Sequence, residues 1–136
     1  MAAPNVQPLF SRVANLGYVV LTTGFAESTG VDAVLLFTAD PTNGSFIASV
    51  VAFPLGTNVA SVLRVFVNNG SAFTTASNNT LWNEASLPAT TATQVAAQSQ
   101  VILTVNFAVP PSYRLGVLIG TTVSAGWGIT CLGGTY

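Results

Sequence analysis

The sequence contains no histidine and no lysine, and these two absences remove most of the usual catalytic chemistry. Histidine is the commonest general base and a frequent zinc ligand, and it belongs to the Ser-His-Asp and Cys-His arrangements. Lysine is required for Schiff-base chemistry and for the phosphate-binding P-loop. Four carboxylates remain, at Glu27, Asp32, Asp40 and Glu84, and they form no catalytic motif. We therefore expect no enzyme, no metal site and no cofactor.

Ionised side chains of either sign are scarce. Only 5% of the 136 residues are charged and the net charge is -1, whereas ordinary soluble domains are about 25% charged. The cations are too few to displace counterions from nucleic-acid phosphates or to hold the chain at an anionic membrane surface. Because soluble monomers usually keep a well-charged exterior, we expect the chain to cover much of its surface with copies of itself or a larger assembly. A neutral, Thr-rich monomer is the alternative.

Long hydrophobic runs and paired cysteines are also missing. No apolar run approaches the roughly 18 residues of a membrane helix, and the first residues lack the basic and apolar regions of a signal peptide. We expect neither feature. The single Cys131 excludes an intramolecular disulfide, and its apolar surroundings in the sequence predict a small buried hydrophobe.

What the sequence does contain is two-residue alternation. Windows rich in Val, Ile, Thr and Phe are separated by Gly, Asn and Pro, which predicts strands and turns. In the clearest window, Val101, Leu103 and Val105 point to one side, and Gln100 and Thr104 point to the other. The expected strands cover residues 16–23, 31–39, 45–53, 59–68, 80–87, 100–107, 112–120 and 125–132.

The connections between these windows favour a particular all-β fold. The pairs Asn43-Gly44 and Asn69-Gly70 can supply the positive φ of tight hairpins, and residues 87–100 suit a Greek-key crossover or one helical turn. About eight short antiparallel strands in a single domain predict a two-sheet β-sandwich of jelly-roll type. An immunoglobulin-like sandwich is the alternative. We expect the β-sandwich domain to cover 16–136, after an extended N-terminal arm, 1–15, that becomes ordered only against a partner.

The strand expected at 59–68 has apolar residues on both faces. Leu63 and Val65 supply the core, which leaves Val62, Arg64 and Phe66 on the opposite face. We expect these three residues to contact another subunit, since arginine is enriched at such contacts. The alternative is that Arg64 lies at a sheet edge with its stem along apolar neighbours.

Three segments resemble a known family. They are "GTNVASVLRVFVNNGS" (56–71), "SNNTLWNEASLPATT" (77–91) and "PPSYRLGVLIGTTVSAGWGITCLGGTY" (110–136). Together they resemble small virion structural proteins of tailed bacteriophages and prophages, over roughly residues 17–136. The motifs within them, "GTNVA…R.F.NNG" and "AGW", are structural rather than chemical. Among phage components of this size, the chain looks most like a capsid decoration (cement) protein.

The resemblance implies a non-enzymatic protein of the virion. Such a protein is made in the bacterial cytoplasm and binds the major capsid protein and copies of itself, commonly as a homotrimer, on the capsid surface. We expect Leu9, Phe10 and Arg12 of the arm to contact the capsid or a neighbouring protomer. The alternative is a tail or fibre component that binds a host surface polysaccharide or protein. In that case Trp82 or Tyr113 should line a groove beside Asn and Asp.

Overall fold

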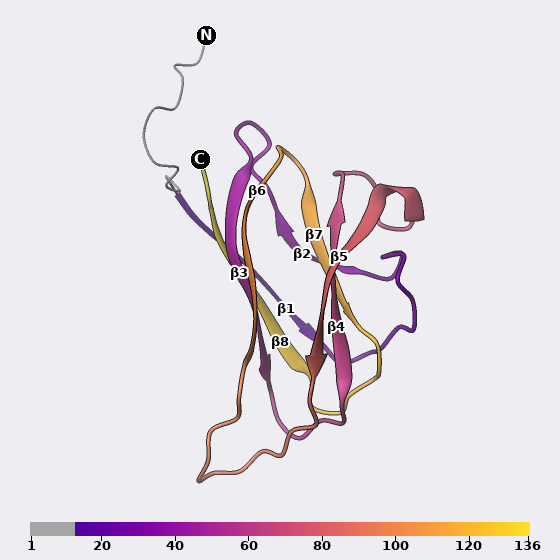
Figure 1. Cartoon of the computed structure of the whole chain (residues 1–136), viewed down its shortest axis with the longest axis vertical. Coiled ribbons are helices and arrows are strands. Elements are labelled where there is room, and N and C mark those ends of the chain that lie inside the picture. Colours follow the sequence, from indigo (N-terminus) through magenta and orange to yellow (C-terminus); the bar gives the residue numbers. More distant parts are fainter. Residues whose placement is uncertain (1–12) are drawn as a thin grey trace.

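The computed structural model describes residues 13–136, which form two four-stranded antiparallel sheets (Figure 1). The strands are β1 (Val13–Leu21), β2 (Val34–Thr38), β3 (Ser45–Pro54), β4 (Ser61–Asn68), β5 (Asn79–Leu87), β6 (Val101–Val109), β7 (Arg114–Ile119) and β8 (Trp127–Thr135). A single 3₁₀ turn, η1 (Ala76–Asn78), precedes β5. Within residues 13–136, no helix is long and apolar enough to cross a membrane.

The eight expected strands are all confirmed, with ends that move by a few residues. One change affects the start of the domain, where β1 begins at Val13 rather than at residue 16. Residues 13–15, which the sequence placed in the arm, therefore belong to a strand. The rest of the expected arm lies outside the described residues, and so do Leu9, Phe10 and Arg12.

The strand order is that of a jelly roll. One sheet has the order β1-β8-β3-β6 and the other has the order β2-β7-β4-β5. The first strand pairs with the last, the second with the seventh, the third with the sixth and the fourth with the fifth. A long hairpin rolled into two layers produces this pattern, which confirms the expected fold. The immunoglobulin-like alternative is wrong, because that fold keeps its first two strands in one sheet.

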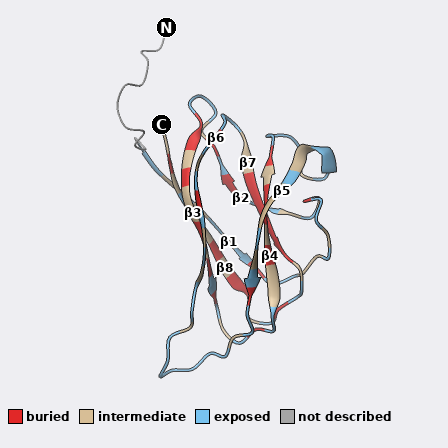
Figure 2. Cartoon of the chain, in the orientation of Figure 1, coloured by how far each residue is buried: buried red, intermediate tan, exposed pale blue. Residues whose placement is uncertain are grey.

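The core lies between the two sheets. Its largest fully buried side chains come from strands of both sheets, and Figure 2 shows the buried residues concentrated in the strands. They include Leu63 and Val65 of β4, Leu115 and Val117 of β7, and Trp127 and Ile129 of β8. The alternation expected in β6 is confirmed, since Val101, Leu103 and Val105 pack against this core.

The turns are placed correctly, but they do not join tight hairpins. Gly44 and Gly70 have φ of 74° and 94°, the left-handed region that glycine tolerates best. The turn at Gly44 nevertheless connects β2 to β3, which lie in different sheets, and the turn at Gly70 only begins the longer connection 69–78. Residues 88–100 form no helix and cross from β5 to β6 as a loop that projects beyond the sandwich (Figure 1).

Cys131 supplies a prediction of pH dependence. It is a fully buried free thiol, and burial raises its pKa from 9.0 to about 12. The thiol ionises more readily in the unfolded chain, so its contribution to stability is complete below the unfolded pKa and is lost as pH rises through the folded pKa. Between those pH values we expect the unfolding free energy of the wild type to fall more steeply than that of Cys131→Ala, by up to about 1.4 kcal/mol per pH unit. Urea denaturation at several pH values measures this difference, and parallel slopes would contradict the burial of the thiol.

Candidate interaction surfaces

The outer face of the sheet β2-β7-β4-β5 is covered by the chain's own loops. Residues 22–33, between β1 and β2, lie against it on the side away from the other sheet (Figure 1), and Phe66 of β4 is 0% exposed. A Cβ atom added at Gly30 would lie only 2.9 Å from Cδ1 of Phe66. The expectation that Phe66 needs another subunit to cover it is therefore corrected, because the cover comes from the same chain.

Glu27 organises this covering loop. Its carboxylate accepts hydrogen bonds from the backbone N–H groups of Thr29, Gly30 and Asp32 and from the Thr29 hydroxyl. Burial, the largest single influence, raises the pKa of Glu27, but the hydrogen bonds from Thr29, Asp32 and Gly30 together bring the pKa below its ordinary value. The carboxylate is thus occupied in holding the loop and is not free to act on a substrate.

Arg64 is also engaged within the chain. Its Nε donates to Oε1 of Glu84 on the adjacent strand at 2.7 Å, and Nη1 donates to the Glu27 carbonyl oxygen at 3.4 Å. Val62 is half-buried and lies against Gly120, where an added Cβ would be 2.6 Å from Cγ1 of Val62. The expected partner contacts of Val62 and Arg64 stay predictions.

The aromatic residues considered for sugar stacking are mostly packed. Trp127 is in the core, and Trp82 packs edge-to-face on Phe107 with ring centroids 5.3 Å apart. Tyr113 does line a shallow hollow of about 180 Å³ with several asparagines. However, Asn78 and Asn79 use their side-chain amides to hold backbone carbonyls of the loop. The hollow therefore presents few free polar groups to a sugar.

The described chain also lacks a cluster suited to metal chemistry. Within residues 13–136, no group of three or more His, Cys, Asp or Glu residues comes together. Glu27 and Asp32 share the loop before β2, Asp40 is in the turn after β2, and Glu84 is on β5, where it pairs with Arg64. Asp40 binds its own turn, since its Oδ1 accepts hydrogen bonds from the backbone N–H groups of Thr42 and Asn43.

The outer face of the sheet β1-β8-β3-β6 differs from the rest of the surface, because it is open, apolar and uncharged. None of the charged side chains in residues 13–136 lies on it. They occupy the loops or the other sheet, at Glu27, Asp32, Asp40, Arg64, Glu84 and Arg114. We define the outer face by outward residues of the four strands, namely Leu16, Tyr18, Val20, Ser49, Val51, Phe53, Ile102, Thr104, Thr130 and Leu132.

Strand register aligns these residues in rows across the sheet. Tyr18 is opposite Thr130, which is opposite Val51, which is opposite Ile102. Four strands about 4.8 Å apart and roughly 30 Å long give a projected area of about 570 Å². That area approaches the roughly 800 Å² that each partner contributes to a standard protein interface. The largest apolar patch on a typical monomer covers about 300–600 Å² and is often functional, and this face lies at the upper end of that range.

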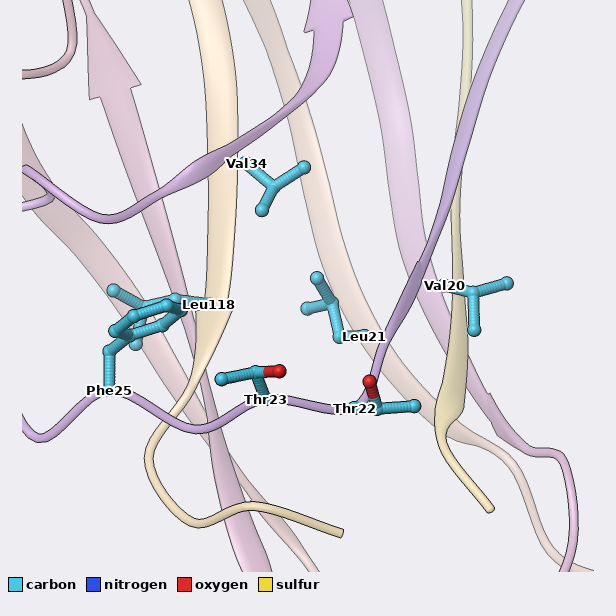
Figure 3. A pocket seen from close by; sticks show the side chains of 7 residues that line it. All are labelled: Val20, Leu21, Thr22, Thr23, Phe25, Val34 and Leu118. Carbon is cyan, nitrogen blue, oxygen red and sulfur yellow. The ribbon is translucent and has the colours of Figure 1, made fainter. Parts of the chain in front are cut away.

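An apolar hollow of about 280 Å³ lies at the end of β1 (Figure 3). Side chains from β1, from the segment after it, from β2 and from β7 surround it, and none of them is ionisable. Its lining residues are Val20, Leu21, Thr22, Thr23, Phe25, Val34 and Leu118. Such a hollow can hold an apolar group, but it offers no acid, base or nucleophile beyond two threonine hydroxyls.

No protein-family model matches the sequence, and no curated protein matches it. Four chains of solved structures do match. One comes from "Structure of infectious bursal disease virus Gx strain", with a TM-score of 0.34 and 12% identity, over 99% of this chain and 36% of that chain. The chain therefore spans about a third of the length of that viral chain.

Proposed function

We propose that the chain is a non-enzymatic structural protein of a bacteriophage virion, which binds the major capsid protein on the capsid surface as a decoration protein. The outer face carries this proposal, because it is a four-strand surface without charge that nothing in residues 13–136 covers. The virion setting rests on the resemblance of segments 56–71, 77–91 and 110–136 to phage virion proteins. The fold itself does not specify a function.

The chemistry of the outer face defines the partner that it would fit. A surface without charge gains little from electrostatic steering, so its binding energy must come from burying apolar area. A shell presents many identical sites, and multiple modest contacts between assembled proteins give stable attachment. The expected contact on the capsid is therefore an apolar surface without fixed charge.

Phe53→Glu tests this assignment. Phe53 is 45% exposed on the outer face, so a carboxylate there stays hydrated in the free protein but must be desolvated when the face is covered. We expect its affinity for purified capsid shells of the encoding phage to fall at least about tenfold, which corresponds to about 1.4 kcal/mol. Co-sedimentation of the protein with the shells measures the loss.

Val95→Glu is the matched control. Val95 is 95% exposed in the projecting loop 88–100 and lies on none of the four strands of the outer face, so this variant should bind shells like the wild type. Equal binding by Phe53→Glu and the wild type would contradict the role of the outer face. A wild-type chain that ignores shells, or that a virion reconstruction places on the tail, would instead favour the tail or fibre alternative, for which the Tyr113 hollow would be the place to look.

A further inference from the structure

The four edge strands of the two sheets differ in how well another strand could pair with them. The edges are β1 and β6 in one sheet and β2 and β5 in the other. Proteins usually protect such edges with bulges, charges, prolines or short strands, because an exposed regular edge is a template for pairing with another chain.

Three of the four edges carry such protection. β2 is only five residues long and has an extra residue, Leu36, opposite β7. β5 has an extra residue, Trp82, opposite β4 and carries the charge of Glu84. β6 is interrupted beside Asn106, whose φ of 51° breaks the extended conformation.

β1 has none of these features. It pairs with β8 over all nine residues without a register shift, and it contains no charged residue and no proline. Its other edge is free in the part of the chain that the structure describes. Its outward side chains Leu16, Tyr18 and Val20 are all exposed, so the strand combines a regular edge with an apolar row.

We infer that β1 is a self-association edge, at which a second copy of this chain adds its own β1 in antiparallel register. The two copies of the sheet β1-β8-β3-β6 then form one continuous eight-stranded sheet. This inference goes beyond the proposed function, because it concerns the chain in solution and needs no capsid.

A second copy fits this edge for several reasons. An antiparallel strand pair is symmetric, so one twofold axis satisfies both edges at once. No charges oppose each other in β1, and antiparallel overlap of residues 13–21 places Leu16 of each copy opposite Tyr18 of the other, as an apolar cross-strand pair. With full overlap, Val13 of one copy lies opposite Leu21 of the other, beside the apolar hollow.

The contact area is also sufficient. The side of the sandwich along β1 is about 30 Å long and roughly 20 Å wide, from strand rise and sheet spacing. Two copies would then bury about 1,200 Å² in total, which is the lower end of the range for specific interfaces. Since the other three edges are protected, pairing ends at two copies instead of continuing into a filament. The homotrimer implied by the resemblance would need a different contact.

Sedimentation equilibrium of the full chain, from micromolar to millimolar concentration, tests the inference. We expect the wild type to form dimers, and we expect Leu16→Lys to weaken the dimer at least about tenfold. Each lysine then lies opposite Tyr18 of the other copy and diagonal to the second lysine, about 7–8 Å away across the new strand pair. The matched control is Ile102→Lys on β6, since Ile102 is 54% and Leu16 is 57% exposed on the same outer face. The control should dimerise like the wild type.

Each other outcome overturns the inference. A monomeric wild type would show that β1 does not self-associate. A trimer would require a contact between two different surfaces of the chain, which antiparallel pairing of β1 does not provide. Equal losses in Leu16→Lys and Ile102→Lys would indicate face-to-face packing of the outer faces. Dimers that neither substitution weakens would place the contact elsewhere.

Cross-linking gives a second readout that does not depend on affinity. Under mild oxidation a mixture of Leu16→Cys and Tyr18→Cys chains should form disulfide-linked dimers, because these two positions lie directly opposite each other in the full-overlap register. A mixture of Ile102→Cys and Tyr18→Cys chains should not. The native thiol adds no background, because Cys131 is fully buried. Hydrogen exchange completes the test, since β1 amides should become more protected as concentration rises. Protection that is independent of concentration would assign the edge to another segment of the same chain and would overturn the inference.

Discussion

Phe66→Ala is expected to lower the free energy of unfolding by about 3–5 kcal/mol, the usual range for truncation of a fully buried phenylalanine. Phe66 is 0% exposed although it faces away from the main core. The cover is the loop 22–33, whose Gly30 approaches the ring so closely that an added Cβ would be 2.9 Å from Cδ1. Truncation therefore leaves a cavity between the sheet and a loop of the same chain.

Phe53→Ala is the matched control for this experiment. It removes the same side chain from the outer face of the other sheet, where Phe53 is 45% exposed, so about half of the loss or less is expected. Urea denaturation at low protein concentration compares the two variants without a contribution from association. If Phe66→Ala is as mild as Phe53→Ala, the loop does not cover the ring in solution.

Asn58→Ala is expected to lower the free energy of unfolding by about 2 kcal/mol or more, since buried polar groups left without partners cost about 1–3 kcal/mol each. The Asn58 side chain is buried between two loops. Its Oδ1 accepts hydrogen bonds from the N–H groups of Ala125 at 3.0 Å and Gly126 at 2.9 Å. Its Nδ2 donates to the Gly126 carbonyl at 3.0 Å. Alanine would leave the N–H groups of Ala125 and Gly126 without this partner, whereas the Gly126 carbonyl keeps its hydrogen bond from the Leu55 N–H.

Asn69→Ala serves as the comparison, because it removes the same side chain from an exposed turn. Its Oδ1 accepts one hydrogen bond, from the N–H of Ser71, so a loss of about 1 kcal/mol or less is expected. Thermal and urea denaturation of the two variants measure the difference. Similar losses would mean that water replaces the Asn58 contacts at little cost.

The Asn58 contacts also explain what two of the sequence motifs do in the fold. The "GTN" of residues 56–58 and the "AGW" of residues 125–127 are far apart in the chain, yet their residues bind each other in the fold. Likewise Arg64 of the first motif segment pairs with Glu84 of the second. These links support the expectation that the motifs are structural, and none of them forms a reactive group.

The strands could be predicted because each depends on a local pattern. Alternation in β6 identified Val101, Leu103 and Val105 as inward residues, and the glycines at 44 and 70 adopt the positive φ that their turns suggested. The cover over Phe66 could not be predicted in the same way. Alternation tells which residues share a face, but the loop 22–33 that lies on that face has no periodicity of its own.

The candidate surface was only partly predictable for a similar reason. Leu16, Tyr18 and Val20 fall within the expected strand 16–23, but the sequence predicted no interaction surface there. Whether these residues form an interaction surface depends on which strands lie at the edges of the sheets and which of those edges are irregular. Those properties arise from pairing between distant segments, as in the extra residue Trp82 of β5, and a single sequence does not reveal the register.

The position of β8 has a consequence for biosynthesis. A ribosome reaches this strand after the other seven, yet β8 lies between β1 and β3 and pairs with both. A nascent chain that ends before Trp127 thus has a gap inside one layer, and β1 has no neighbour in that layer. Folding must wait for the distal segment, and a topology so rich in non-local pairing acquires its native state slowly, on the order of milliseconds to seconds. During that interval the cell's chaperones would meet a chain whose first strand is still unpaired.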